Sequence, residues 1–248
     1  VPGWFTDAAA RLRSASGAAA PVAANDAAAT VVAGGTDLVV QRPDLLDQPA
    51  LTLLSRRPGL TDIGRDGEHL VVGGGVTIAD LGDHPLFRQL VPAAPAIVAR
   101  FASTLIRNRA TVAGNLVNAS PIGDLTVLLL ALDAGVVLVG GPDGSRVVPL
   151  ADFYRGYKQL DLAPGELVER VRVPLAVADA DVSFEKVSQR HILDIASVNS
   201  ALRLRLDPEG VVRDLTLAVG GVAPVPLVAR EAAATLRGRV LDAAAVRE

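Results

Sequence analysis

The sequence predicts a mixed α+β fold, and three patterns along its 248 residues support this prediction. Short β-branched runs end at glycines at 30–35 and 69–75, which is typical of strands that enter a turn. An apolar run at 125–132 predicts a buried helix, and the residues after Gly135 form short strand-like runs separated by turn residues. With 50% hydrophobic residues the chain can bury a sizeable core, which excludes a disordered protein.

The first half of the chain is expected to mix helices and strands. Thr77 can cap a helix together with Asp80, three positions on. Ser120-Pro121 is a typical start for the buried helix, with serine as cap and proline in the first turn. The other expected elements are a helix at 8–13 followed by a tether, strands at 30–33 and 69–72, a helix at 92–101, and a largely looped segment at 104–118 around one short strand.

After Gly135 the pattern changes to strands. Turn sequences at 140–144 and 207–210 each separate two β-rich runs. The expected strands cover 136–139, 146–148, 169–174, 182–187, 195–206 and 211–219, and a helix is expected at 229–237. A boundary near 174–181 divides the chain into an N-terminal helix and tether (1–28), a main domain (29–176) and a smaller α+β domain (177–248) that looks incomplete.

Composition and charge exclude several kinds of site. The formal net charge of −3 argues against a nucleic-acid surface, which needs clustered Lys and Arg. Zero cysteines exclude disulfides, Cys-based zinc sites and iron–sulfur ligation within this chain. The three histidines lie far apart in the sequence, so no metal site is expected.

The sequence also predicts where the protein resides. No apolar run approaches the roughly 20 residues that a membrane span needs, and no secretory signal opens the chain. We therefore expect a cytoplasmic protein without a membrane span. Because methionine is absent even at position 1, the sequence is expected to be part of a longer gene product.

Two glycine-bearing segments are the candidate ligand-binding features, Ala33-Gly34-Gly35-Thr36-Asp37 and Thr111-Val112-Ala113-Gly114-Asn115. Glycine admits a positive φ and a close approach of the main chain to a ligand, and successive backbone N–H groups can then surround a phosphate. Hydroxyl and amide side chains add donors. The sequence holds no Walker A motif, no G-x-G-x-x-G fingerprint and no G-x-S-x-G elbow. The segments are either a site for the two phosphates of a dinucleotide or ordinary turns.

A longer stretch gives these segments a context. Ile106–Leu116 contains Arg-Asn-Arg followed by Thr-Val-Ala-Gly-Asn, and Asn118–Asp124 continues with Ser-Pro-Ile-Gly-Asp before the apolar helix. In this order the motifs resemble the FAD-binding subunit or domain of the molybdenum hydroxylases, the family of xanthine dehydrogenase and of the medium subunit of aerobic CO dehydrogenase. Further similar segments lie at 33–38, 153–157, 162–166, 184–190, 194–198 and 220–224.

The resemblance implies two α/β subdomains that form a PCMH-like FAD-binding domain, followed by a smaller antiparallel sheet with helices. It places the FAD diphosphate between 31–38 and 111–115 and implies no catalytic side chain. The family usually has two consecutive glycines where this chain has Ala113-Gly114. Because a positive φ at alanine is strained, either position 113 is not left-handed in this chain or FAD binding is weakened. The residues implied to bind FAD are Val31, Val32, Ala33, Gly34, Gly35, Thr36, Asp37, Leu38, Phe101, Thr111, Val112, Ala113, Gly114, Asn115, Asp124, Val168 and Lys186.

Several of these residues also have a plain structural interpretation. Phe101, implied to contact the flavin, is equally suited to the core. Asp124, implied near the adenosine portion, suits the first turn of a helix, and Lys186 suits a solvated strand. Arg107 and Arg109 either order their loop through its carbonyls or face a partner subunit.

The resemblance implies an oxidoreductase component that transfers electrons. FAD receives them from iron–sulfur clusters, which a cysteine-free chain cannot ligate, and an acceptor such as NAD, a quinone or dioxygen takes them up. The implied partners are a molybdopterin-binding large subunit and a small [2Fe-2S] subunit, or fused domains equivalent to them. Two alternatives stay open: a self-contained FAD-dependent oxidase or dehydrogenase of related fold, and a flavin-free scaffold subunit, which Ala113 favours.

Overall fold

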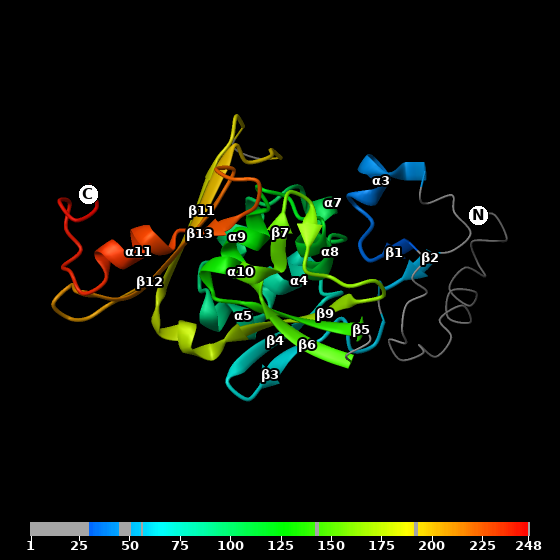
Figure 1. The fold of residues 1–248 in the computed structure, drawn as a ribbon, viewed down its shortest axis with the longest axis horizontal. Helices are drawn as coiled ribbons and strands as arrows, with labels where there is room; N and C mark the ends of the chain where they lie inside the picture. Colours follow the sequence, from blue (N-terminus) through cyan, green and yellow to red (C-terminus); the bar gives the residue numbers. More distant parts are fainter. Residues whose placement is uncertain (1–29, 45–50, 56, 142–143, 191–192, 248) are drawn as a thin grey trace, which may run out of the picture.

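The computed structural model describes residues 30–44, 51–55, 57–141, 144–190 and 193–247, and it confirms a mixed fold of helices and antiparallel sheets. Figure 1 shows three parts in a row: a small N-terminal unit, a central body and a C-terminal sheet. The helix expected at 8–13 and the tether after it lie outside the described residues. None of the described helices is long and apolar enough to cross a membrane.

The small N-terminal unit begins with the strand that was expected at 30–33. This strand, β1 (Thr30–Val32), pairs in parallel with β2 (Leu51–Leu53). The short helix α3 (Leu38–Gln41) lies between them in the sequence and has Asp37 as its N-cap. The first glycine-bearing segment is therefore the connection from a strand to a short helix.

The central body is built on five antiparallel strands in the order β3-β4-β9-β5-β6. They are β3 (Ile63–Asp66), β4 (His69–Gly73), β5 (Gly135–Gly141), β6 (Gly144–Pro149) and β9 (Leu167–Pro174). β9 lies in the middle of the sheet, and its alternation buries Val171 and Val173 while Arg170 and Arg172 stay partly exposed. The expected strands are confirmed, and β3 is an addition to them.

The helices of the central body supply most of its core. They are α4 (Ile78–Asp83), α5 (Pro85–Leu90), α6 (Ala94–Ala99), α7 (Thr104–Arg107), α8 (Val112–Val117), α9 (Asp124–Ala131) and α10 (Leu150–Phe153), followed by the strand pair β7 (Tyr154–Gly156) and β8 (Gln159–Leu160). Thr77 caps α4 as expected, because its Oγ1 accepts a hydrogen bond from Asp80 N at 3.0 Å. The leucines of α9 are buried all round, as expected of a helix without a polar face.

The expectation of a loop with one strand at 104–118 is wrong. This segment forms α7 and α8, and each helix starts at a hydroxyl cap. Ser103 Oγ accepts a hydrogen bond from Ile106 N at 3.2 Å, and Thr111 Oγ1 accepts one from Gly114 N at 3.2 Å. A side-chain cap satisfies a backbone N–H that has no partner in the first turn, which allows helices of this length to form despite the glycine and asparagines.

The expected start of the buried helix at Ser120-Pro121 is also wrong, because α9 begins at Asp124. The Ser120 carbonyl accepts from Gly123 N within a turn, and the next two carbonyls bind the C-terminal part instead of the helix. Pro121 O accepts from Gly221 N at 3.0 Å, and Ile122 O accepts from Asn199 Nδ2 at 3.1 Å. Residues 120–123 therefore form a turn that contacts the neighbouring sheet.

The C-terminal part is a four-stranded antiparallel sheet in the order β10-β11-β12-β13, connected to β9 by the 3-10 helix η2 (Leu175–Asp179). Its strands are β10 (Asp181–Val187), β11 (Val198–Leu206), β12 (Val212–Gly220) and β13 (Leu227–Val228). α9 packs on one face, and α11 (Arg230–Leu236) packs on the other through Ala233 and Leu215. The expected strands and helix of this part are confirmed, with β11 starting at Val198.

Candidate functional site

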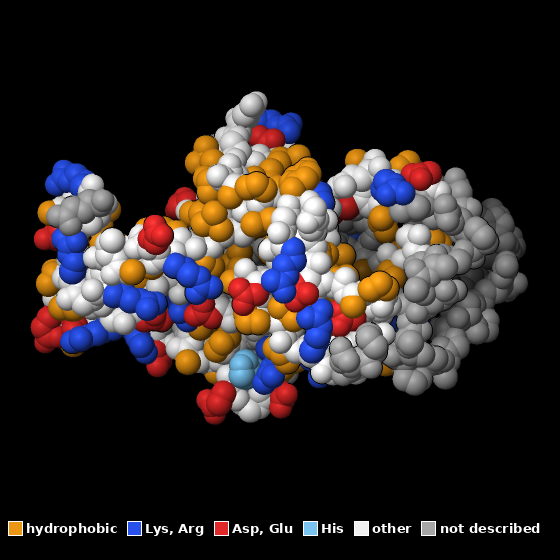
Figure 2. All heavy atoms as spheres, in the orientation of Figure 1, with side chains coloured by type: hydrophobic (Ala, Val, Ile, Leu, Met, Phe, Trp, Pro, Cys, Tyr) orange, Lys and Arg blue, Asp and Glu red, His pale blue; other side chains and the backbone are white. Residues whose placement is uncertain are grey.

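A cavity of about 560 Å³ lies between the small N-terminal unit and the central body. Figure 2 shows the surface hollowed at this place. The volume is in the range of binding sites for small ligands and cofactors. Both glycine-bearing segments line the cavity, although they are far apart in the sequence. The cavity is lined by Val31, Ala33, Gly34, Gly35, Thr36, Asp37, Leu38, Gln41, Arg42, Leu54, Ala110, Thr111, Ala113, Gly114, Asn115, Val117, Asn118, Lys158, Leu162, Leu167 and Val168.

The first wall of the cavity is the turn between β1 and α3. Gly35 has a φ of +74°, which favours glycine, and its carbonyl accepts a hydrogen bond from Val39 N at 3.0 Å. Gly34 is required for another reason, because a Cβ there would lie 2.0 Å from the backbone oxygen of Arg109. The main chain of the first wall therefore lies directly against the residues that precede Thr111.

The second wall is the first turn of α8. Thr111 is its N-cap, and a Cβ at Gly114 would lie 2.8 Å from Thr111 Oγ1. Ala113 is helical and is not among the residues with a positive φ, so the alternative that position 113 is not left-handed holds. The expectation of a positive-φ glycine loop is thus wrong for this segment, because the threonine cap starts a helix. Ala113 therefore carries no positive-φ strain that would favour a flavin-free scaffold.

A third wall of the cavity is apolar and comes from the segment 162–168. Arg146 does not line the cavity, but it binds Glu166 of this segment. The Arg146 Nε and Nη2 atoms donate to the two carboxylate oxygens of Glu166, each at 2.7 Å. Nη1 donates to Asp161 Oδ2 at 3.1 Å. The hydrogen bonds from this guanidinium hold the pKa of the Glu166 and Asp161 carboxyl groups below their ordinary values. No local sequence pattern marks this network, because its members come from separate strands and loops.

The cavity also has cationic side chains that no sequence motif marks. Lys158 has a φ of +56°, and its Nζ donates to the carbonyl oxygen and, at 3.0 Å, to the side-chain oxygen of Asn118. Arg42 lies at the C-terminal end of α3, within 3.6 Å of Asp44. A lysine in a short turn and an arginine before a proline carry no motif, so only the fold brings them to this cavity.

The residues implied to bind FAD fall into three groups in the structure. Those that line the cavity are Val31, Ala33, Gly34, Gly35, Thr36, Asp37, Leu38, Thr111, Ala113, Gly114, Asn115 and Val168. Val32 and Val112 belong to the same segments but are buried in the protein. Phe101, Asp124 and Lys186 do not line the cavity and lie together where the central body meets the C-terminal sheet.

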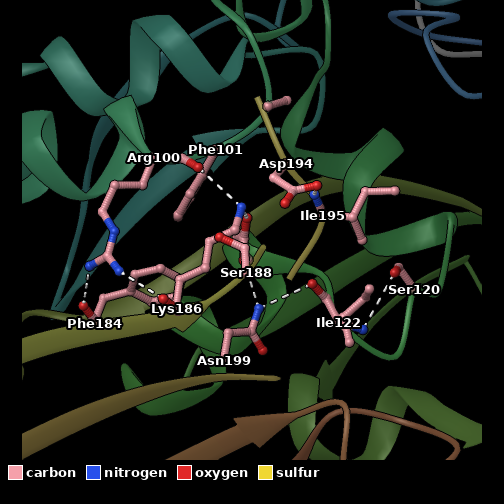
Figure 3. A network of polar contacts seen from close by, with 12 residues as sticks. Arg100, Phe101, Ser120, Ile122, Phe184, Lys186, Ser188, Asp194, Ile195 and Asn199 are labelled. Atoms are coloured by element: carbon pink, nitrogen blue, oxygen red, sulfur yellow. Dashed lines mark hydrogen bonds and ion pairs between the residues drawn. The ribbon is translucent and has the colours of Figure 1, made fainter. Parts of the chain in front are cut away.

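We call this meeting place the charged junction, and Figure 3 shows it from close by. It consists of Arg100, Phe101, Asp124, Phe184, Lys186 and Asn199. Asp124 Oδ2 accepts a hydrogen bond from Lys186 Nζ at 2.7 Å, and Oδ1 accepts one from Asn199 Nδ2 at 2.7 Å. The side chains of Lys186 and Asp124 are 5% and 13% exposed, so this ion pair is largely removed from water.

Arg100 and Phe101 close the charged junction from the side of α6. The Arg100 guanidinium donates to the carbonyls of Phe184 and Lys186 at 2.9 and 3.2 Å, and Lys186 Nζ donates back to the Arg100 carbonyl at 3.1 Å (Figure 3). The rings of Phe101 and Phe184 pack edge to face with centroids 5.3 Å apart. In the described structure, Phe101 is a buried core residue and Asp124 and Lys186 are partners of each other.

The two arginines of the Arg-Asn-Arg motif have different positions. Arg107 orders its own loop, since its Nη1 donates to Phe101 O at 2.7 Å and its Nη2 donates to Thr104 Oγ1 at 3.0 Å. Arg109 is exposed, and its backbone oxygen is the atom that lies against Gly34. The carbonyl-ordering alternative therefore holds for Arg107.

The cavity is equipped to bind a ligand rather than to perform acid–base chemistry. Backbone groups close to glycine, the hydroxyls of Thr36 and Thr111, the Asn115 amide and the Lys158 ammonium are donors suited to phosphate oxygens, and the 162–168 segment offers an apolar surface. These residues fit a dinucleotide. Among the described residues, no group of three His, Cys, Asp or Glu side chains can hold a metal ion.

Comparison with known proteins gives a consistent result for both parts of the chain. Residues 9–176 match the family described as the FAD binding domain in molybdopterin dehydrogenase. Residues 183–248 match the CO dehydrogenase flavoprotein C-terminal domain. These matches confirm the resemblance drawn from the motifs around 106–124.

Individual relatives differ greatly in length. The chain is 31% identical to nicotinate hydroxylase of Emericella nidulans over 70% of its own length but spans only 14% of that protein. It is 28% identical to the nicotinate dehydrogenase FAD-subunit of Eubacterium barkeri over 87% of this chain and 74% of the relative. The solved carbon monoxide dehydrogenase of Hydrogenophaga pseudoflava superposes with a TM-score of 0.83 and 29% identity, covering 92% of this chain and 82% of that chain.

Proposed function

Because this chain belongs to the family of FAD-binding domains of molybdopterin dehydrogenases, an oxidoreductase family with FAD as its cofactor, we propose that it is the electron-transfer component of a molybdenum hydroxylase. Bound FAD supplies the redox chemistry, because it accepts and donates both single electrons and pairs. The proposed electron source is an iron–sulfur cluster of a partner, and the proposed acceptor is NAD, a quinone or dioxygen.

One observation carries this proposal: the two glycine-bearing walls converge on one cavity. Gly34 lies against the Arg109 backbone, so the strand-to-helix turn and the start of α8 are fixed relative to each other. We place the FAD diphosphate between these walls, with Thr36, Thr111 and Asn115 as neutral donors. The chain's contribution is to bind and orient the cofactor and to exclude water from it.

The three implied residues outside the cavity enter the proposal in a different role. Asp124, Lys186 and Phe101 hold the C-terminal sheet against the central body through the charged junction. In this role they position the part of the protein that adjoins the cofactor-binding domain, and their effect on FAD is indirect.

The proposed partners follow from what this chain lacks and from its relatives. The sequence has no cysteine to ligate a cluster, and one relative is itself named as an FAD-subunit. We propose a molybdopterin-binding large subunit and a small [2Fe-2S] subunit, or fused equivalents, as partners. A cytoplasmic location is part of the same proposal.

Flavin reconstitution tests the proposed function. The purified chain is incubated with excess FAD, freed of unbound flavin and denatured, and the released flavin is identified and quantified. About one FAD per chain is the expected result, since the cavity offers one site. FMN in a parallel sample serves as a control, because it lacks the second phosphate and the adenosine. A chain that retains no FAD contradicts the proposal.

Anaerobic stopped-flow mixing of the FAD-loaded chain with NADH then tests the acceptor. Reversible loss of the oxidised flavin absorbance supports NAD. If NADH does not lower the oxidised flavin absorbance, a quinone or dioxygen is the proposed acceptor.

A further inference from the structure

A buried chain of hydrogen bonds lies directly behind the second wall of the cavity. Asn115, which lines the cavity, is in α8, and Thr126, which is fully buried, is in α9. Thr126 Oγ1 donates to Asn115 Oδ1 at 3.3 Å and lies 3.5 Å from Tyr154 OH. Tyr154 OH donates to the carbonyl of Leu116 at 3.2 Å.

The direction of this chain follows from its protons. Burial raises the pKa of the Tyr154 phenol, so the hydroxyl keeps its single proton. The carbonyl of Leu116 can only accept, and it takes that proton. Thr126 also has a single proton, and the nearer of its two neighbours is Oδ1 of Asn115.

This contact determines which end of the Asn115 amide faces the ligand. The amide oxygen is held by Thr126 on the protein side, and Nδ2 has no acceptor among the described residues. We propose that Thr126 is a positioning residue whose buried hydroxyl fixes the Asn115 amide with its N–H groups toward the cavity, where they donate to an oxygen of bound FAD. The inference rests on the proposed function, because FAD is the ligand.

Without the threonine hydroxyl, the two ends of the amide have nearly the same shape and nothing buried distinguishes them. An amide that presents its oxygen repels a phosphate or carbonyl oxygen of the ligand, whereas one that presents its nitrogen binds it. Holding the amide in advance therefore improves affinity without adding any contact to the ligand.

Two substitutions at position 126 test the role of the hydroxyl. Thr126→Val keeps the branched shape and removes the hydroxyl, and Thr126→Ser keeps the hydroxyl and removes a methyl group. FAD affinity, measured by titration of flavin fluorescence, is expected to fall about threefold to tenfold in Thr126→Val and to recover in Thr126→Ser. The unfolding midpoint without FAD is recorded for each variant, so that a loss of fold is distinguished from a loss of affinity.

Two substitutions at position 115 test the orientation of the amide. In an Asn115→Ala background, Thr126→Val is expected to cause no further loss of affinity, because the group that it positions is gone. Asn115→Asp is expected to bind FAD more weakly than Asn115→Ala, because it places a carboxylate oxygen where the amide N–H groups were. Equal binding by Thr126→Val and the unchanged protein, or binding by Asn115→Asp as tight as by Asn115→Ala, overturns the inference. Failure of the unchanged protein to bind FAD overturns the proposed function instead.

Discussion

The cavity and the charged junction are built from different kinds of chemical groups, although one short stretch of sequence contributes to both. The cavity is lined by main chain, hydroxyls, amides and apolar groups, together with Asp37, Arg42 and Lys158. The charged junction buries an ion pair between Asp124 and Lys186 with a separation of 2.7 Å. Thr111–Asn115 serves the first region and Asp124 serves the second. A family motif can thus combine residues that line a cavity with residues that hold the protein together.

The helix α9 connects the two regions physically. Its first residue, Asp124, bonds to the C-terminal sheet, and Thr126 bonds toward the cavity wall. Just beyond its other end, Asp133 accepts a hydrogen bond from Arg203 of β11 at 2.6 Å. The C-terminal sheet is therefore attached to both ends of one buried helix.

The largest expected effect comes from a substitution that disrupts the cavity and leaves the charged junction intact. Gly34→Ala should abolish FAD retention, because its Cβ would lie 2.0 Å from Arg109 O and 2.8 Å from Arg109 C, and backbone atoms cannot move aside as a side chain can. The two walls must then separate. Released flavin after reconstitution is the measurement.

Gly64→Ala is the matched control for this variant. A Cβ at Gly64, in β3, meets no heavy atom within 4 Å, so this variant should retain FAD like the unchanged protein. Full FAD retention by Gly34→Ala would show that the close approach of the two walls is not needed for binding.

The second largest effect is expected from substitutions that disrupt the charged junction and leave the cavity intact. Asp124→Asn leaves Lys186 nearly buried without a charged partner and should lower the free energy of unfolding by about 3 to 5 kcal/mol. Combining it with Lys186→Met removes the unpaired charge and should restore most of that loss, because an apolar replacement of both charges is often neutral. Urea unfolding of both single variants and of the double variant measures the coupling.

FAD titration of the same double variant decides between the two interpretations of the charged junction. A stable double variant that binds FAD normally supports a positional role for Asp124 and Lys186. A stable double variant that has lost FAD binding would instead show that they contact the cofactor, as the family resemblance implies.

Local sequence patterns predicted most of the strands and helices because those elements have clear local signals. The apolar run of α9, the alternation in β9 and the Thr77 cap are each visible within a few neighbouring residues. The start of α9 was not predictable, because it depends on Gly221 and Asn199 occupying the preceding carbonyls. Helices as short as α7 and α8 leave too few residues for a periodic signal.

The candidate site was predictable only in part for a similar reason. The glycines marked both walls, but the need for glycine at position 34 comes from the Arg109 backbone. Only tertiary structure brings Lys158 to the cavity and the Arg146–Glu166 network to the segment that forms its apolar wall. The resemblance supplied Asp124 and Lys186 but could not show that they bond to each other.

A smaller effect tests the charges behind the apolar wall of the cavity. The pKa of Glu166 is lowered in the folded protein by hydrogen bonds from Arg146, so the unfolded chain binds a proton more readily. Stability is therefore full above the ordinary carboxyl value of 4.5 and is lost as the pH falls through the lower, folded value. Glu166→Gln should lower the free energy of unfolding by about 1 to 2 kcal/mol at pH 7 and reduce its dependence on pH below 5.

Urea unfolding from pH 7 to pH 3 measures this dependence, and Glu169→Gln is the control. Glu169 pairs with the adjacent Arg170 and does not contact Arg146, so its variant should keep the pH dependence of the unchanged protein. An identical pH dependence in Glu166→Gln would contradict the role assigned to this network.

The smallest effect concerns the position where the chain departs from its family. Ala113→Gly restores the usual pair of glycines, yet Ala113 is helical and its N–H already donates to Gly74 O at 3.0 Å. FAD affinity should therefore stay unchanged, while the free energy of unfolding falls by about 1 kcal/mol, the cost of glycine in a helix. Ala96→Gly, at an exposed position of α6, is the control and should show a similar loss without touching the cavity. A clear gain in FAD affinity for Ala113→Gly alone would mean that the bound state needs a positive φ at this residue. The second wall would then have to reorganise around its ligand, while the charged junction stays fixed.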